Sequence, residues 1–140
     1  MNCSRRDLCL LVTALAASTG YAAGNTALPS KAFPYSELPV RKSGENEFRP
    51  ILSGQLHDGG YVEVHQTRLA PGAMPHPAHH HLHEEMFLVR EGTVEMTISG
   101  KATQLGPGSV GFAGSNDEHG IRNSGATPAE YFVIAFGKDA

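Results

Sequence analysis

The chain has 140 residues, the length of a single domain, and a formal charge of −3 with histidine counted as neutral. This nearly balanced charge, with no basic run or stripe, argues against a nucleic-acid-binding protein. The 16 glycines and nine prolines favour many short elements joined by tight turns over long helices.

Residues 1–23 have the three-part pattern of a secretory signal peptide. Arg5 and Arg6 form a charged start, and an apolar run over residues 8–17 precedes several small residues. The apolar run is too short to cross a bilayer, which takes about 20 residues, so we expect no stable membrane anchor. The protein is therefore predicted to be exported, with the periplasm as its compartment.

The charged start also matches the twin-arginine type of export signal, because Ser4 precedes the arginine pair and Leu8 follows it. An ordinary export signal is the alternative. The twin-arginine route carries folded proteins, so a metal could be loaded in the cytoplasm before export. Both cysteines, Cys3 and Cys9, lie inside the signal, and the mature chain is expected to contain no disulfide and no sulfur ligand.

Residues 24–50 are predicted to form an irregular N-terminal arm, because Pro, Ser, Lys and Glu are frequent and aromatic residues are isolated. Such an arm could wrap around the folded domain or a neighbouring subunit. Turn residues recur at short, regular intervals over residues 51–140, and this part is assigned to one folded domain.

The segments between these turns are predicted to be strands. Apolar and polar residues often alternate in them, and no 3.6-residue apolar period appears outside the signal. The predicted strands cover residues 61–69, 85–90, 93–98, 101–105, 109–113, 119–123 and 129–136. Short strands at this spacing indicate an all-β sandwich or barrel, and antiparallel chains of this length often close into jelly rolls.

Five of the eight histidines fall between residues 76 and 83. Side chains of one parity share a face of an extended chain, and this face carries four potential ligands: His79, His81, His83 and Glu85. Imidazole and carboxylate groups together suit Mn, Fe, Ni, Cu or Zn. A further ligand must come from elsewhere, and His119 is the distant histidine that lies beside both a turn and a strand.

Two segments resemble the two sequence motifs of the cupin superfamily, and the chain is similar to a small single-domain cupin with an export signal. Residues 71–92 contain the His-x-His, Glu and Gly positions of the first motif, with six residues before the first histidine where five are usual. Residues 106–123 resemble the second motif, with Ala113 in place of the usual proline. The resemblance covers about half of the chain.

The resemblance implies a double-stranded β-helix, which is the jelly-roll barrel of cupins. It implies that one divalent transition metal is held by His79, His81, Glu85 and His119, with one or two positions left for water or substrate. Manganese or iron is favoured if the ion is loaded before export, and nickel, copper and zinc are alternatives. Because many cupins are dimers, a homodimer is a further expectation.

Several alternatives stay open at this level. The histidine run could be a solvated surface feature, although parity, spacing and the second motif favour an ordered site. His83 could replace His79 as a ligand, and Gln66 or Arg68 could line the cavity. The remaining histidines are interpreted as polar or surface residues: His57, His65, His76 and His80.

The predicted function is that of a metal-dependent enzyme acting on a small molecule, of the dioxygenase, decarboxylase or isomerase type. The alternative is a non-catalytic protein that binds or senses a metal or a small ligand. The sequence identifies no general base, and the catalytic residues are not assigned. A domain that has kept its ligands only in part fits least well, because the four-ligand set is complete.

Overall fold

A computed structural model describes residues 27–137, which form nine strands and one short 3₁₀ turn, η1 (Tyr35–Glu37). The strands are β1 (Arg41–Ser43), β2 (Asn46–Gln55), β3 (Tyr61–Leu69), β4 (Glu84–Glu91), β5 (Val94–Ile98), β6 (Lys101–Leu105), β7 (Val110–Ala113), β8 (His119–Asn123) and β9 (Ala129–Gly137). They make a six-stranded sheet in the order β1-β2-β3-β9-β4-β7 and a three-stranded sheet in the order β6-β5-β8.

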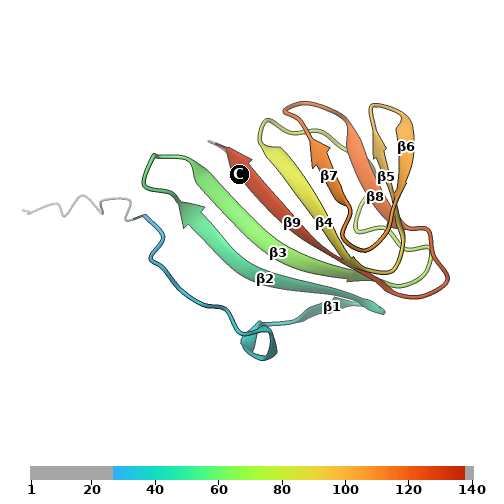
Figure 1. Ribbon diagram of the computed structural model, residues 1–140, viewed down its shortest axis with the longest axis horizontal. Coiled ribbons are helices and arrows are strands. Elements are labelled where there is room, and N and C mark those ends of the chain that lie inside the picture. The colour runs from blue at the N-terminus through green and yellow to red at the C-terminus, as the bar shows by residue number, and fades with distance from the viewer. Residues whose placement is uncertain (1–26, 138–140) are drawn as a thin grey trace, which may run out of the picture.

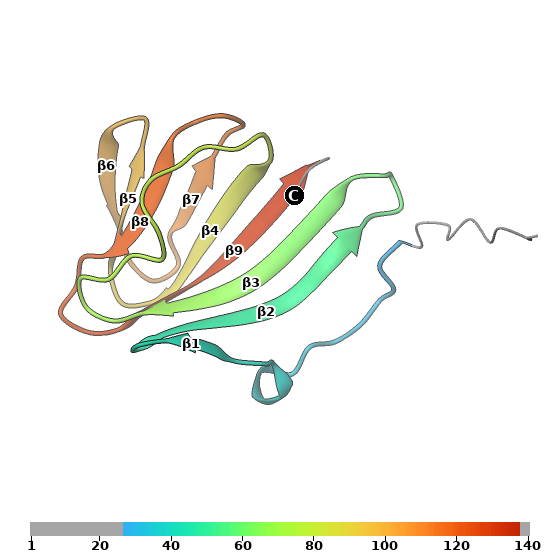
Figure 2. The same ribbon diagram turned by 180° about the vertical axis from the view of Figure 1, so that it is seen from behind.

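The two sheets are antiparallel, and the second half of the chain passes repeatedly between them (Figure 1). The chain leaves the large sheet after β4, returns for β7, leaves for β8 and returns for β9. Figure 2 shows the small sheet beside the β4 and β7 side of the curved large sheet. This alternation builds a jelly roll, so the predicted all-β barrel is confirmed.

The core lies between the sheets, where side chains of one parity point inward from each strand. On β4 these are Phe87 and Val89, and on β5 they are Val94 and Met96, as the sequence alternation predicts. The cluster is completed by Leu69, Ala113, Ile121, Ala129, Tyr131 and Val133.

The strand positions predicted from residue 61 onward agree with the structure, but the irregular arm is wrong in its second half. β1 and the first part of β2 lie in the segment predicted to be irregular. Gly44, with φ of +60°, turns the chain between them. Pro50 makes β2 hard to recognise in the sequence, because proline has no backbone N–H to donate to a sheet. The strand accommodates Pro50 at a register shift between Pro50 and Leu52.

The predicted signal peptide lies outside residues 27–137, so the structure gives no information on it. Within the described part of the chain, no helix is both long enough and apolar enough to span a membrane.

Candidate metal centre

The histidines meet because the loop between β3 and β4 runs beside the start of β8. His79 and His119 form an isolated antiparallel bridge, with backbone N-to-O distances of 3.0 and 2.8 Å. Asn116 donates its backbone N–H to the carbonyl of His81 at 2.8 Å, which ties the next part of the loop to the β7–β8 connection. These main-chain bonds bring together two segments that are about 40 residues apart in sequence.

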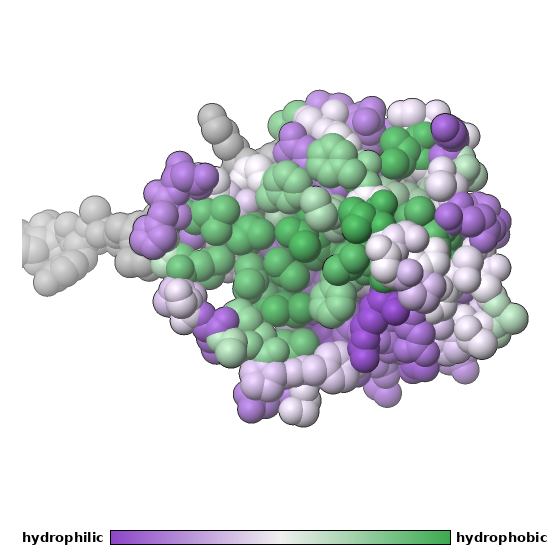
Figure 3. All heavy atoms as spheres, viewed as in Figure 1, coloured by the Kyte–Doolittle hydropathy of each residue, from purple (hydrophilic) through white to green (hydrophobic). Residues whose placement is uncertain are grey.

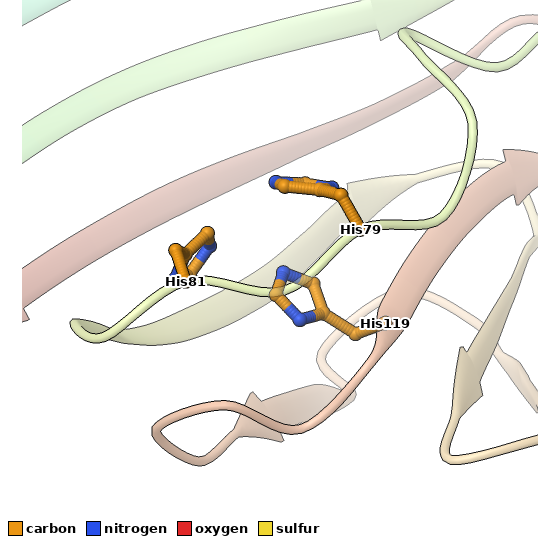
Figure 4. A group of neighbouring side chains, drawn as sticks. All are labelled: His79, His81 and His119. Carbon is orange, nitrogen blue, oxygen red and sulfur yellow. The ribbon is translucent and has the colours of Figure 1, made fainter.

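His79, His81 and His119 direct their rings toward one another (Figure 4). One ring nitrogen from each lies within 4.8 Å of those of the other two. The ring centroids are 5.1 Å apart for His79 and His81, 4.9 Å for His79 and His119, and 4.8 Å for His81 and His119. Three imidazoles at this spacing can hold a single metal ion.

Backbone carbonyls set the tautomers of two of these rings. The Nδ1 of His119 lies 2.8 Å from the carbonyl oxygen of Asp117, and the Nδ1 of His81 lies 2.9 Å from that of His83. A carbonyl oxygen only accepts, so each Nδ1 carries the proton and donates it. In the neutral form of each ring, Nε2 then carries the lone pair that a metal-binding histidine requires.

Two ring nitrogens in the cluster are buried without a hydrogen-bond partner: Nδ1 of His79 and Nε2 of His81. A buried polar atom left in this state costs about 1–3 kcal/mol, and nearly all such atoms find a partner in folded proteins. Burial and the neighbouring imidazoles of His76 and His119 lower the pKa of His79, which favours its neutral form. A neutral ring with an unpaired nitrogen, as at His79, fits a metal ion.

Glu85, at the start of β4, supplies a carboxylate to the same cluster. Its Oε2 lies 3.1 Å from Nε2 of His119, and its Oε1 lies 3.6 Å from Nε2 of His81. The structure therefore brings together all four residues that the sequence motifs indicate.

His83 stays an alternative ligand. Its ring stacks on that of His81 with 3.6 Å between centroids, and its Nε2 lies 3.8 Å from Oε1 of Glu85. Ring nitrogens of His81 and His83 and a Glu85 oxygen form a second group within 4.8 Å of one another. The two groups share His81, so both are geometrically able to hold an ion.

A cavity of about 490 Å³ opens beside the cluster and is lined by His79, Glu85 and His119. Its walls are mainly apolar, with contributions from Leu69, Phe87, Ile121, Tyr131 and Val133. Arg41 and Lys42 of β1 lie among the lining residues. The cavity therefore joins the candidate metal ligands to a basic group of residues from the β1–β2 hairpin.

The cavity also shows which side of β3 faces inward. Gln66 and Arg68 do not line it, because Gln66 donates to Glu130 at 2.9 Å and Arg68 pairs with the same carboxylate on the opposite face of the sheet. The prediction that either residue lines the cavity is wrong, because the odd-numbered residues of β3 face the cavity and these two residues are even-numbered. His65 and Thr67 line it instead.

His65 is therefore more than the plain polar residue that the sequence suggested. Its ring packs 4.6 Å from that of Phe48 in the cavity wall. Burial lowers its pKa, and the carboxylate of Glu63 opposes that shift. The alternating pattern of β3 places His65 on the same face as Thr67, but the sequence does not show that this face points into the cavity.

Tyr131, in β9, was also missed as a cavity residue, because its strand reads as a plain apolar run. It is 1% exposed and lines the cavity. Burial raises its pKa, while a hydrogen bond with Thr67 acts the other way. His76 and His80, interpreted as surface residues from the sequence, are exposed, and so is His57. The ring of His76 also lies edge-on to that of His79, with 4.3 Å between ring centroids.

The family model described as "Cupin domain" matches residues 65–135, which is just over half of the chain. An L-ectoine synthase from Bordetella parapertussis is 35% identical over 63 residues, which are 44% of this chain and 48% of that protein. An L-ectoine synthase from Bordetella bronchiseptica matches to the same extent. The matched region thus spans about half the length of these curated relatives.

Solved structures share the fold. A predicted oxalate decarboxylase from Thermotoga maritima has a TM-score of 0.62 and 21% identity, with coverage of 73% of this chain and 95% of that one. An RmlC-like cupin from Shewanella frigidimarina has a TM-score of 0.63 and 18% identity, with coverage of 77% and 92%. These matches confirm the jelly-roll fold predicted from the two motifs.

Proposed function

The chain belongs to the cupin family, and from this premise we propose that it binds one divalent transition metal and a small molecule in the adjoining cavity. The proposed ligands are His79, His81, Glu85 and His119. Two observations carry the proposal: His79, His81 and His119 each offer a ring nitrogen within 4.8 Å of those of the other two, and Nδ1 of His79 and Nε2 of His81 are buried without a hydrogen-bond partner. A bound metal would act as a Lewis acid and hold open positions for water or substrate.

We propose manganese or iron as the native metal, with nickel, copper and zinc as the alternatives. Nitrogen and oxygen donors accept all five ions, and copper or zinc would win an open competition. Export by the twin-arginine route would avoid that competition, since the protein would fold around its metal in the cytoplasm. Copper or zinc in protein isolated from its native compartment would contradict this route.

Catalysis on a small molecule is the function that this geometry supports best. The L-ectoine synthases that match the chain bear an enzyme name, as does the predicted oxalate decarboxylase. The cavity offers a proton acceptor in His65, whose buried ring is favoured in its neutral form. Tyr131 keeps its proton, because burial raises its pKa, and can only donate or accept a hydrogen bond.

The β1–β2 hairpin favours a small molecule with an acidic group. Arg41 lies over the ring of Phe48, with 5.9 Å between the guanidinium carbon and the ring centroid. Among residues 27–137 it has no carboxylate within salt-bridge distance. An unpaired guanidinium among the cavity-lining residues suits a carboxylate, because its planar donors match the two oxygens.

A non-catalytic binding or sensing protein is the second candidate. Within the described residues, Glu47 is the carboxylate that lines the cavity besides Glu85. It already pairs with Arg49 at 2.6 Å and with Lys42 at 3.3 Å. A cavity with so few free acid–base groups favours binding without turnover. The two candidates share the metal site, so they are separated by assays for product.

The first experiment measures the metal content of the purified protein and of three variants. We expect a near-stoichiometric ion in the wild type, and its loss in His81→Ala and in His119→Ala. His80→Ala is the matched control, because His80 is exposed in the same run, and it should keep the ion. Metal retained in His119→Ala would mean that the run binds by itself, and the proposed site would be wrong.

A further inference from the structure

His83 is a histidine of the run that the proposed four-ligand site leaves out. Its ring stacks on that of His81, with 3.6 Å between centroids and 9° between planes. One ligand atom from each of His81, His83 and Glu85 lies within 4.8 Å of the other two. We call these three residues the outer group, and we call His79, His81 and His119 the inner group. Each group has the spacing of a site for one metal ion.

The two groups share His81, and this residue can serve only one of them at a time. Its Nδ1 donates to the carbonyl of His83 at 2.9 Å, so Nε2 is the nitrogen left to bind a metal. That Nε2 is buried without a hydrogen-bond partner. A ring nitrogen has one lone pair and can bind one ion. The inner and outer groups are therefore alternative positions for the same ion, and they cannot both be filled.

Glu85 faces the two groups with different oxygens. Its Oε2 lies 3.1 Å from Nε2 of His119 in the inner group. Its Oε1 lies 3.6 Å from Nε2 of His81 and 3.8 Å from Nε2 of His83. His81 and Glu85 can therefore stay bound while His83 is exchanged for the other two histidines of the inner group. Such an exchange connects the two positions without a stage at which all protein ligands are lost.

The two groups open to different sides of the barrel. The cavity is lined by His79, Glu85 and His119, whereas His81 and His83 are not among the residues that line it. The side chain of His119 is 2% exposed, but those of His81 and His83 are 17% and 20% exposed. The outer group therefore has its own contact with solvent, separate from the cavity that would bind a small molecule.

Carboxylates flank the outer group. The Oε2 of Glu84 and the Cβ of His83 lie 3.5 and 3.2 Å from the position that a Cβ atom on Gly137 would occupy. Asp117 lies in the β7–β8 connection, which is hydrogen-bonded to the carbonyl of His81. Within residues 27–137, neither Glu84 nor Asp117 forms an ion pair with a lysine or an arginine. Their negative charges are therefore free to attract a cation.

The other approaches suit a cation less well. The cavity is lined by Arg41, whose guanidinium has no carboxylate within salt-bridge distance in the described part of the chain. The broad side of the six-stranded sheet that is seen in Figure 3 is mainly hydrophobic. Because unpaired charges steer ions of opposite sign, the carboxylates favour entry of a cation at the outer group, and Arg41 favours entry of an anion at the cavity.

We propose that the outer group is the entry site for the metal, from which His81 and Glu85 pass it on to the inner group. This inference rests on the proposed function, because it requires an ion held by the inner group. His83 acts on the path to the site and is not part of the final ligand set. It therefore changes the rates of metal uptake and release by the same factor and leaves the dissociation constant unchanged.

The test is stopped-flow mixing of the metal-free protein with Co²⁺, which binds the same nitrogen and oxygen donors and whose visible absorption reports its coordination. His83→Phe keeps a ring beside His81 but removes the ligand nitrogen. Uptake of Co²⁺ should become about tenfold slower, and its release into excess chelator should slow by the same factor. His83→Gln should give the same result with a polar side chain in place of the ring.

His80→Phe is the matched control, because His80 is exposed in the same run and belongs to neither group. It should leave both rates unchanged, and circular dichroism should show the same fold for all variants. Unchanged rates in both His83 variants would overturn the proposal. So would a weaker affinity with an altered Co²⁺ spectrum, because His83 would then be a ligand in the final site.

Failure of the proposed function gives a different result. In that case Co²⁺ would not bind the wild type, or it would bind His119→Ala with full affinity. If Co²⁺ binds the wild type and is lost in His119→Ala, the proposed site stands, and the rates of the His83 variants decide the entry site alone.

Discussion

Two buried polar side chains of β8, His119 and Asn123, are held by hydrogen bonds to main-chain carbonyls. His119 is 2% exposed and is fixed by the carbonyl of Asp117. Asn123, at the end of the same strand, is fully buried, and its amide donates to the carbonyls of Leu69 at 3.0 Å and Thr127 at 2.8 Å. Its Oδ1 accepts from the N–H of Gly125 at 2.9 Å, so it closes the turn that follows β8.

Asn123→Asp should therefore destabilise the protein by about 2–4 kcal/mol. The substitution keeps the shape but replaces two donated bonds with a carboxylate that faces two carbonyl oxygens. Urea unfolding followed by circular dichroism measures the change. Asn116→Asp is the control: Asn116 is exposed, with φ of +62°, a conformation that both residues tolerate, and it should change stability little. Equal effects would show that the buried network is not the cause.

At the residue scale, alternation in the sequence predicts the ligand candidates but not the cavity. His79, His81 and Glu85 share a parity, and the structure places them on one side of the chain. His65 escapes prediction because the apolar pair Val62 and Val64 of β3 lies on the face away from the cavity, and Tyr131 escapes it because β9 carries apolar residues on both faces. The pattern that would label one face as interior is then absent, and only the closed barrel identifies it.

The elements are defined mainly by their turns. The β4–β5 turn passes close to the start of β9, and Gly92, with φ of +75°, lies within it. A Cβ atom at this position would come 2.7 Å from the Cα of Ala129 and 2.7 Å from the carbonyl oxygen of Pro128. Gly100, between β5 and β6, has φ of +80° but no heavy atom within 4 Å of such a Cβ.

Substitutions at Gly100 and Gly92 distinguish the free-energy cost of a left-handed backbone from the cost of steric overlap with neighbouring atoms. Gly100→Ala should destabilise the protein by about 1–2 kcal/mol, the cost of a left-handed backbone for a residue with a Cβ. Gly92→Ala should cost more, by about 1–3 kcal/mol beyond that, because backbone atoms must also move. The measurement is the free energy of unfolding in urea. If the free energy of unfolding fell equally at the two positions, the start of β9 would have to move away from the added Cβ atom at no energetic cost.

At the element scale, the strands after residue 61 could be predicted because glycine-containing turns separate them and their apolar residues alternate. β2 could not, because Pro50 interrupts its pattern and its partner, β3, is needed to reveal the pairing across the register shift. The approach of the β3–β4 loop to β8 is implied by the resemblance to the two cupin motifs, and no apolar pattern of the sequence predicts it. It depends on main-chain bonds between His79 and His119, which no side-chain pattern encodes.

In the whole molecule, the candidate metal centre lies where the two sheets meet. Glu85 belongs to the six-stranded sheet, His119 to the three-stranded sheet, and His79 and His81 to the loop between β3 and β4. An ion held by all of them would connect both sheets and the loop. Because the unfolded chain cannot present these ligands together, such an ion binds the folded state and stabilises it.

Adding Mn²⁺ to metal-free protein should therefore raise the free energy of unfolding of the whole barrel. At an ion concentration about 100 times the dissociation constant, the expected gain is about 2.7 kcal/mol. His80→Ala should show the same gain, and His119→Ala should show almost none. A full gain in His119→Ala would show that the stabilising ion does not need His119, and the proposed four-ligand site would then be wrong. An ion held loosely by the histidine run alone would also bind the unfolded chain, and it would give little gain in any of the variants.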